Sequence, residues 1–206
     1  GFLMRRRALE KIKSIIRRFG VDIVGFPKAG YDEEDLPEDL HPFTKEIFKA
    51  VKPYTMTCIE RVDALINAVQ YIVENNIEGA MVECGVWRGG SIMTMALTLK
   101  KLGIENKEIY LYDTFSGMTE PAEVDVAVDG ETAKQIFSQK KISQDQSDWC
   151  FSSLEEVKDN IFSTGYPKEL FHFVKGKVEN TIPQAIPDKI SLLRLDTDWY
   201  ESTKHE

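Results

Sequence analysis

The sequence has few cysteines, no long apolar run and little positive charge, and each shortage excludes a class of protein. The three cysteines, Cys58, Cys84 and Cys150, are too few and too scattered for a disulfide framework or a zinc site. No run reaches the roughly 18 apolar residues that span a bilayer. The net charge of −8 argues against a nucleic-acid ligand, because phosphate backbones require clustered cations. We therefore expect a globular protein of the reducing cytoplasm.

The composition that is present suits one globular domain with a small appendage. The chain has 206 residues, of which 42% are apolar and 29% are charged, enough to bury one good-sized core. We expect residues 1–42 to form the appendage, as a basic helix followed by an acidic loop. Residues 43–206 are expected to form the main domain.

The positive charge is concentrated at the start of the chain. Residues 1–18 carry seven cations against Glu10 alone, a net charge of +6, which leaves −14 for residues 19–206. Apolar residues at helical spacing predict a basic amphipathic helix over 5–19. We expect this helix to pack against a second subunit of a homo-oligomer rather than against lipid, and packing on its own domain is the alternative.

Short apolar segments alternate with helical patterns after residue 43, which is typical of an α/β fold with a parallel sheet. The expected strands are AMVEC (80–84), IYLYD (109–113), LFHFVKG (170–176) and ISLLRLD (190–196). Helices are expected at 58–73, 92–102, about 134–140 and about 153–163. The polar segment 114–149 is far longer than the about 12–15 residues of ordinary connections, so we expect a mobile lid.

A glycine-rich turn follows the first expected strand, in VECGVWRGGS (82–91). Gly85 allows a sharp turn, and Gly89 and Gly90 allow a ligand to approach the backbone near the start of a helix. Glu83 and Ser91 flank these glycines. A dinucleotide site normally reads Gly-x-Gly-x-x-Gly without a carboxylate, because it binds a pyrophosphate. The acid at this turn favours a ligand with positive charge, such as an amino group or a sulfonium.

Asp113 ends the second expected strand, where a carboxylate can accept hydrogen bonds from both hydroxyls of a ribose. Ligands of parallel sheets bind beyond the carboxyl ends of the strands, so Asp113 and the glycine turn are expected at one site. A nucleoside with a cationic amino-acid tail is S-adenosylmethionine (SAM). The alternative for Asp113 alone is a structural role, as the cap of a turn.

The chain resembles the macrocin O-methyltransferase family of metal-dependent sugar O-methyltransferases from about residue 43 to the last residue. The resemblance is carried by KPYTMTCIERVDALINAVQYI (52–72), VECGVWRGGS (82–91), LYDTFSGMTEP (111–121), VKDNIFSTGYP (157–167), FVKGKVENTIP (173–183) and LLRLDTDWYEST (192–203). It implies a Rossmann-like class I SAM methyltransferase sheet with an N-terminal helical appendage. It also implies methyl transfer to a hydroxyl of a sugar or glycosylated small molecule.

The resemblance implies a set of cofactor contacts. Thr55 and Met56 would line the methionine end of SAM, Glu83, Gly85 and Ser91 would form its cradle, Asp113 would bind the ribose, and Lys177 and Val178 would flank the adenine. The structural alternative for Met56 is a side chain of the hydrophobic core. The alternative for Ser91 is the N-cap of a helix, and both of its roles are compatible.

Two acids follow the fourth expected strand, Asp196 and Asp198, and side chains two residues apart share a face if the strand continues. The resemblance implies that Asp196 is a Mg²⁺ ligand and that Asp198 is the base that accepts the hydroxyl proton. Magnesium prefers such oxygen ligands. The alternative is that the two acids cap the following helix.

A class I methyltransferase sheet has seven strands, whereas four are found here, so we expect a C-terminally truncated form of the family. In the usual strand order the third strand lies at one edge and the fourth lies beside the first, so the fourth forms the other edge. Two further functions stay open. One is a catalytically impaired protein that binds SAM or acts in assembly, and the other is a nucleotide-binding oxidoreductase.

Overall fold

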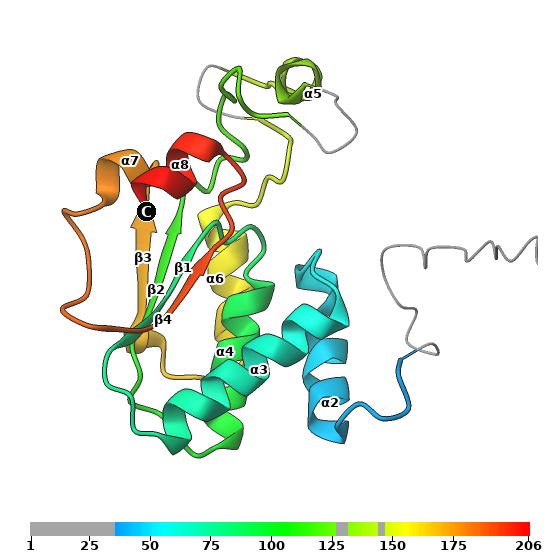
Figure 1. Cartoon of the computed structure of the whole chain (residues 1–206), viewed down its shortest axis with the longest axis vertical. Coiled ribbons are helices and arrows are strands. Elements are labelled where there is room, and N and C mark those ends of the chain that lie inside the picture. Colours follow the sequence, from blue (N-terminus) through cyan, green and yellow to red (C-terminus); the bar gives the residue numbers. More distant parts are fainter. Residues whose placement is uncertain (1–35, 127–131, 144–146) are drawn as a thin grey trace, which may run out of the picture.

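The computed structural model describes residues 36–126, 132–143 and 147–206, so the helix predicted at 5–19 lies outside the described residues. The described residues form a four-stranded parallel sheet with helices packed against it (Figure 1). The strands are β1 (Ala80–Cys84), β2 (Ile109–Asp113), β3 (Phe171–Lys175) and β4 (Ile190–Leu195), in the order β3-β2-β1-β4. The predicted α/β fold and its parallel sheet are confirmed, and β4 lies at an edge as expected.

The four helices predicted from the sequence are present as α3, α4, α5 and α6. The helices are α2 (Pro42–Val51), η2 (Lys52–Tyr54), α3 (Ile59–Glu74), α4 (Gly90–Lys101), α5 (Ala133–Lys140), α6 (Leu154–Phe162), η3 (Lys168–Leu170), α7 (Val178–Thr181) and α8 (Tyr200–His205). Helices α2, η2, η3 and α7 were not predicted, and α8 entered only as the helix that Asp196 and Asp198 could cap. The signal for α2 was present, because its buried residues Ile47, Phe48 and Val51 recur at helical spacing and Pro42 begins it.

Helices α2, α3, α4 and α6 bury one face of the sheet in the main core. Met81 of β1 and Leu111 of β2 point into it and are fully buried, as are Ile59 of α3 and Leu99 of α4. Each such side chain contributes about 1.5–3 kcal/mol through burial. Because side chains alternate along a strand, Val82 and its neighbours point to the opposite face and form a smaller cluster there.

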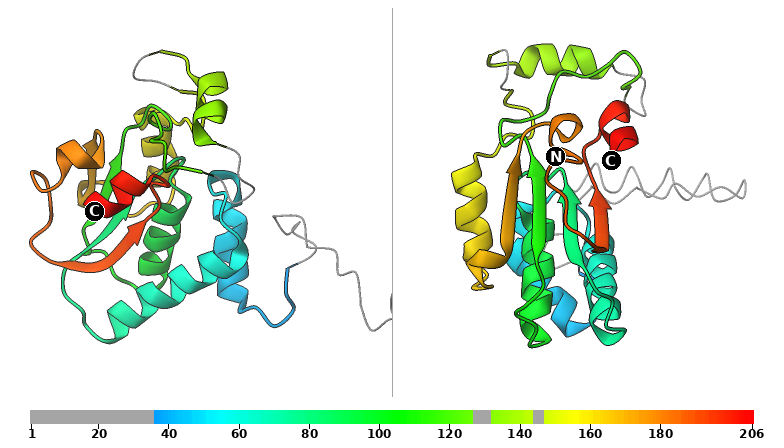
Figure 2. Two further views of the ribbon diagram at one scale, coloured as in Figure 1. Left: turned by 45° about the horizontal axis from the view of Figure 1, so that its top comes forward. Right: turned by 90° about the vertical axis from the view of Figure 1, so that its left-hand side faces the viewer.

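All four strands point to the same end of the molecule, where α7, α8 and the segment that carries α5 gather (Figure 2). This segment belongs to the predicted lid, and its described residues contact the chain after β4. The carboxylate of Asp125 accepts a hydrogen bond from the Tyr200 N–H at 3.0 Å, and the Trp199 indole donates to the Thr119 carbonyl at 3.2 Å. The segment therefore lies against the carboxyl ends of the strands, and its mobility stays a prediction.

The outer side chains of β4 include exposed leucines, with Leu193 50% and Leu195 40% exposed.

Among the residues that the structure describes, no helix combines the length and the apolar character needed to cross a membrane.

Candidate functional site

One cleft at the carboxyl ends of the strands contains all ten residues predicted from the sequence. It is bounded by the turns that follow η2, β1, β2, β3 and β4. The predicted residues along it are Thr55, Met56, Glu83, Gly85, Ser91, Asp113, Lys177, Val178, Asp196 and Asp198. Parallel topology explains the convergence, because segments distant in sequence end at the same edge of the sheet. The individual roles of these residues stay predictions.

Two glycines of the β1–α4 turn allow chain segments to approach closely. Gly85 has a φ of +83°, and a Cβ there would lie 2.2 Å from the Asp196 carbonyl oxygen. A Cβ on Gly90 would lie 2.5 Å from the Tyr54 carbonyl oxygen. The absence of side chains at Gly85 and Gly90 therefore lets the residues after β4 and the last residue of η2 pack directly against the segment between β1 and α4. These close contacts form part of the walls of the cleft.

Substitution of Gly85 by alanine is expected to destabilise the protein by at least about 3 kcal/mol, because the Cβ meets backbone and not a flexible side chain. Gly103 is the matched control, since its φ is +72° but a Cβ there would meet nothing within 4 Å. Gly103→Ala should lower the free energy of unfolding by only roughly 1–2 kcal/mol, the cost of placing an alanine in the left-handed backbone region. Urea unfolding followed by circular dichroism measures both, and equal losses would contradict the steric argument.

The structural alternatives for Ser91 and Met56 are both wrong. The N-cap of α4 is Gly89, whose φ of +90° is left-handed, and Ser91 is the second residue of the helix. Met56 is 67% exposed and does not belong to the hydrophobic core. Both side chains are therefore free of those structural roles and border the cleft.

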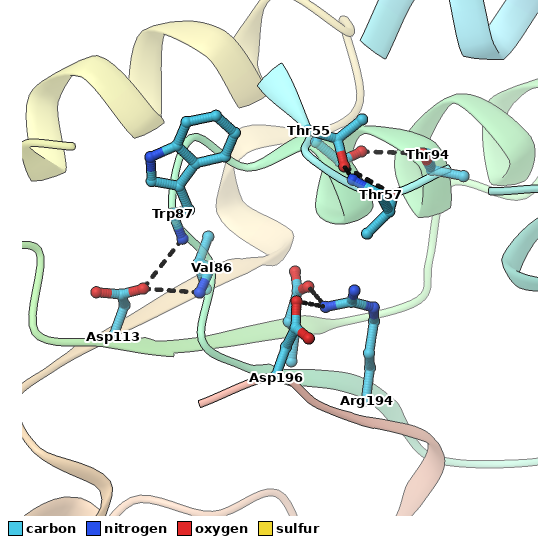
Figure 3. Close-up of polar contacts among 10 residues, drawn as sticks. Thr55, Thr57, Val86, Trp87, Thr94, Asp113, Arg194 and Asp196 are labelled. Atoms are coloured by element: carbon cyan, nitrogen blue, oxygen red, sulfur yellow. Dashed lines mark hydrogen bonds and ion pairs between the residues drawn. The ribbon is translucent and has the colours of Figure 1, made fainter. Parts of the chain in front are cut away.

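Asp113 is held by three backbone N–H groups, and Figure 3 shows the two from Val86 and Trp87. Its Oδ2 accepts hydrogen bonds from Val86 at 2.7 Å and Trp87 at 3.1 Å, and its Oδ1 accepts one from Phe115 at 2.8 Å. The alternative of a turn cap is thus observed. The Thr114 hydroxyl also lies 3.5 Å from Oδ1, but it has a nearer acceptor in the Gly117 carbonyl at 2.9 Å. Because a carboxylate offers about four acceptor positions, one is then left for a ribose hydroxyl. Asp113 also fixes the β1–α4 turn relative to β2.

Glu83 is a buried acid with 1% of its side chain exposed. Its Oε1 accepts a hydrogen bond from Nη1 of Arg194 at 2.5 Å, whereas Oε2 has no hydrogen-bond partner among the described residues. Burial raises the pKa of Glu83 to about 8, against the lowering effect of Arg194, and Asp196 raises it further. Ser91 lies close enough to lower this pKa through a side-chain hydrogen bond, although its hydroxyl does not reach the geometry of a hydrogen bond to Oε2. A buried oxygen without a partner costs about 1–3 kcal/mol, so this place suits a ligand that donates hydrogen bonds.

The two acids after β4 reach the cleft by a route that the sequence did not predict. The strand ends at Leu195 and Asp198 has a φ of +65°, so the condition for a shared face, a strand that continues to Asp198, is not met. The helix-cap alternative is also wrong, because the N-cap of α8 is Trp199 and the Tyr200 N–H bonds to Asp125. Burial raises the pKa of Asp198, Asp196 raises it further, and Arg194 lowers it.

The described residues do not by themselves form a metal site. Within them, no group of three or more histidine, cysteine, aspartate or glutamate side chains gathers around one point. The predicted Mg²⁺ ligand is Asp196, and its Oδ2 accepts a hydrogen bond from Arg194 at 2.9 Å. The described residues therefore do not complete a magnesium site, and the Asp196 ligand role stays a prediction.

Sequence reasoning missed several residues of the cleft. Arg194 touches two of its acids, and its signal was a cation inside the apolar run ISLLRLD. Further cleft residues that were not predicted include Tyr54, Thr114, Met118, Cys150 and Trp199. No local pattern marks these side chains, because they reach the cleft through the tertiary arrangement of the lid and turns.

Comparison with known proteins agrees with this geometry. Residues 49–206 match the family described as macrocin-O-methyltransferase (TylF). Demethyldecarbamoylnovobiocin O-methyltransferase of Streptomyces niveus is 30% identical over 150 residues, which are 73% of this chain and 54% of that protein. The 8-demethyl-8-(2,3-dimethoxy-alpha-L-rhamnosyl)-tetracenomycin-C 4'-O-methyltransferase of Streptomyces olivaceus is 31% identical, with the same coverage of both proteins.

The solved structure of the O-methyltransferase NovP is similar with a TM-score of 0.61 and 29% identity, over 74% of this chain and 59% of NovP. The chain spans about half the length of the curated relatives that it matches. The family match extends over most of the described residues and includes every turn of the cleft, from the one after η2 to the one after β4. By this match, the chain belongs to the macrocin O-methyltransferase family.

Proposed function

We propose that this protein is a SAM-dependent O-methyltransferase that methylates a hydroxyl group of a sugar or glycosylated small molecule. The observation that carries the proposal is the buried, unpartnered Oε2 of Glu83 in the same cleft as Asp198. The ammonium group of SAM is a cation that would satisfy this oxygen. The names of the relatives support the acceptor class, since both are O-methyltransferases and one acts on a rhamnosyl compound.

The proposal gives each wall of the cleft one part of the cofactor. Glu83 binds the ammonium group through Oε2, and Gly85 and Ser91 line the cleft beside it along the methionine chain. Asp113 accepts hydrogen bonds from the ribose with the lone pairs that the turn does not use. Further contacts come from Thr55 and Met56 at the methionine end and from Lys177 and Val178 at the adenine.

When bound, SAM supplies a methyl group on a positively charged sulfur, which is already activated for transfer. The protein then needs to orient the acceptor hydroxyl and remove its proton. Asp198 would accept this proton as the acceptor oxygen takes the methyl group, and S-adenosylhomocysteine would leave. Thr119 and Trp199, which are joined by a hydrogen bond above the cleft, help to exclude water from it.

The proposal also includes a divalent metal ion that assists methyl transfer, with Asp196 as one of its ligands. No step is derived through Mg²⁺, because the described residues do not complete its site. We expect the rate of methyl transfer to fall when EDTA replaces Mg²⁺ in the assay and to recover when excess Mg²⁺ is added. An EDTA-insensitive rate would contradict metal assistance and would leave the cofactor site unaffected.

The proposal is tested first by isothermal titration with SAM and then by mass spectrometry of a panel of rhamnosides and aminocoumarin glycosides incubated with SAM. Micromolar binding and one added methyl group on an acceptor are the expected results. Binding of SAM without transfer to any acceptor would favour the catalytically impaired alternative. Binding of NADH instead of SAM would favour the oxidoreductase, and a folded chain that does not bind SAM would overturn the proposal.

A further inference from the structure

Three charged side chains from neighbouring strands meet at the floor of the cleft. Glu83 of β1 and Arg194 of β4 are register partners in the parallel pair of strands. Asp196 follows Arg194 by two residues at the point where β4 ends. The sheet therefore places one cation between two acids that both border the cleft.

One nitrogen of Arg194 holds both acids. Nη1 donates to Oε1 of Glu83 at 2.5 Å and to Oδ2 of Asp196 at 2.9 Å, and Figure 3 shows Arg194 directed toward Asp196. The Arg194 side chain is 18% exposed and that of Asp196 is 43% exposed. Hydrogen bonds between charged groups are stronger than neutral ones, so Arg194 fixes the orientation of the buried Glu83 carboxylate.

We infer that Arg194 is a positioning residue of the cofactor site, which holds Oε1 of Glu83 so that Oε2 is left to bind the ammonium group of the cofactor. This inference rests on the proposed function. When Glu83 is ionised, the two carboxylates and one guanidinium sum to a charge of −1, which an ammonium group neutralises. Without Arg194, Glu83 would be a buried acid beside a second acid, an arrangement that favours the uncharged form and weakens its hold on a cation.

The test compares ligands with and without the amino-acid tail by isothermal titration. Arg194→Met is expected to weaken binding of SAM and S-adenosylhomocysteine by about tenfold or more. Binding of 5′-methylthioadenosine, which lacks the tail, should change by less than about twofold. Arg194→Lys should restore part of the lost affinity, because lysine keeps the charge but not the planar fork of donors. Arg61→Met, at an exposed position of α3, is the surface control.

A double variant separates positioning from a general effect on structure. Glu83→Gln with Arg194→Met is expected to bind SAM no more weakly than Glu83→Gln alone, since both changes act on one contact. Circular dichroism checks folding, and if Arg194→Met unfolds, Arg194→Lys decides, with a selective loss of affinity for tailed ligands as the expected result.

Four outcomes would overturn the inference. The first is SAM binding by Arg194→Met that is unchanged or tighter, and the second is a loss of 5′-methylthioadenosine binding equal to the loss of SAM binding. The third is a double variant in which the two losses of SAM affinity add. The fourth applies if Arg194→Met unfolds, and it is an Arg194→Lys variant that binds the tailed ligands as tightly as the unmodified chain does. If the unmodified chain binds neither SAM nor 5′-methylthioadenosine, the proposed function fails and the inference fails with it. If the unmodified chain binds SAM but one of the four outcomes is found, the inference about Arg194 fails and the proposed function stands.

Discussion

Replacing Glu83 by glutamine is expected to weaken SAM binding by about 10- to 100-fold, the value of one hydrogen bond between charged groups. The Glu83 side chain is 1% exposed, and its Oε2 has no hydrogen-bond partner among the described residues. Glutamine keeps the shape of this side chain but removes the negative charge of the ionised carboxyl group. The fold should survive, because Arg194 retains Asp196 as a partner. Isothermal titration with SAM measures the loss, and 5′-methylthioadenosine, without an ammonium group, should bind as before.

The pH dependence of binding gives a second readout of the same residue. Burial raises the pKa of Glu83 to about 8, so its carboxyl group is mostly protonated near about pH 6 and becomes ionised as the pH approaches 8. Only the ionised form attracts the ammonium group. SAM affinity should therefore rise with pH in this range, by up to about tenfold per unit.

The glutamine variant should lack this rise in affinity, because an amide does not titrate. Glu78→Gln is the matched control, since Glu78 is an exposed acid just before β1 that pairs with Lys189, and it should leave both affinity and pH dependence unchanged. Retention of full SAM affinity by Glu83→Gln would exclude Glu83 as the ammonium ligand.

Replacing Asp198 by asparagine is expected to lower the rate of methyl transfer by about 10²- to 10⁴-fold, the usual contribution of a general base. An amide cannot accept the hydroxyl proton. Asparagine is chosen because Asp198 has a φ of +65°, and asparagine tolerates the left-handed region about as well as aspartate. SAM affinity should stay within about twofold, because Asp198 is not assigned to the cofactor. Single-turnover mass spectrometry with the acceptor found in the panel measures the rate.

Asp159→Asn provides the control for this substitution, since Asp159 is exposed on α6 and does not line the cleft. It should transfer methyl groups at the unmodified rate. If Asp198→Asn also did so, Asp198 would not be the base. If it lost SAM binding and transfer together, the role of Asp198 would be structural rather than catalytic.

The strands and the glycine turn were predictable because their signals are local. AMVEC and IYLYD are short apolar runs, and the structure places β1 and β2 at the same residues. Parallel topology then placed the residues that follow each strand at one edge. The cleft as a set of residues was thus predictable before the structure, although its chemistry was only partly so.

The details of the site depended on contacts between residues far apart in the sequence. Glu83 and Arg194 are 111 residues apart, and their pairing follows from the register of β1 against β4. The turn at Asp198 interrupts the pattern that a continuing strand would have produced. Met56 has an apolar side chain of the kind found in hydrophobic cores, but it is exposed and lines the cleft.

By itself, the sequence determined the four strands, the helices between them at α4 and α6, the glycine turn and the edge of the sheet where ligands bind, because periodicity and turn chemistry act over a few residues. Only the tertiary structure decided which oxygen of Glu83 is free, what holds Asp113 and Asp196, and which lid residues close the cleft. These properties depend on burial and on hydrogen bonds between distant segments, and no local pattern encodes them.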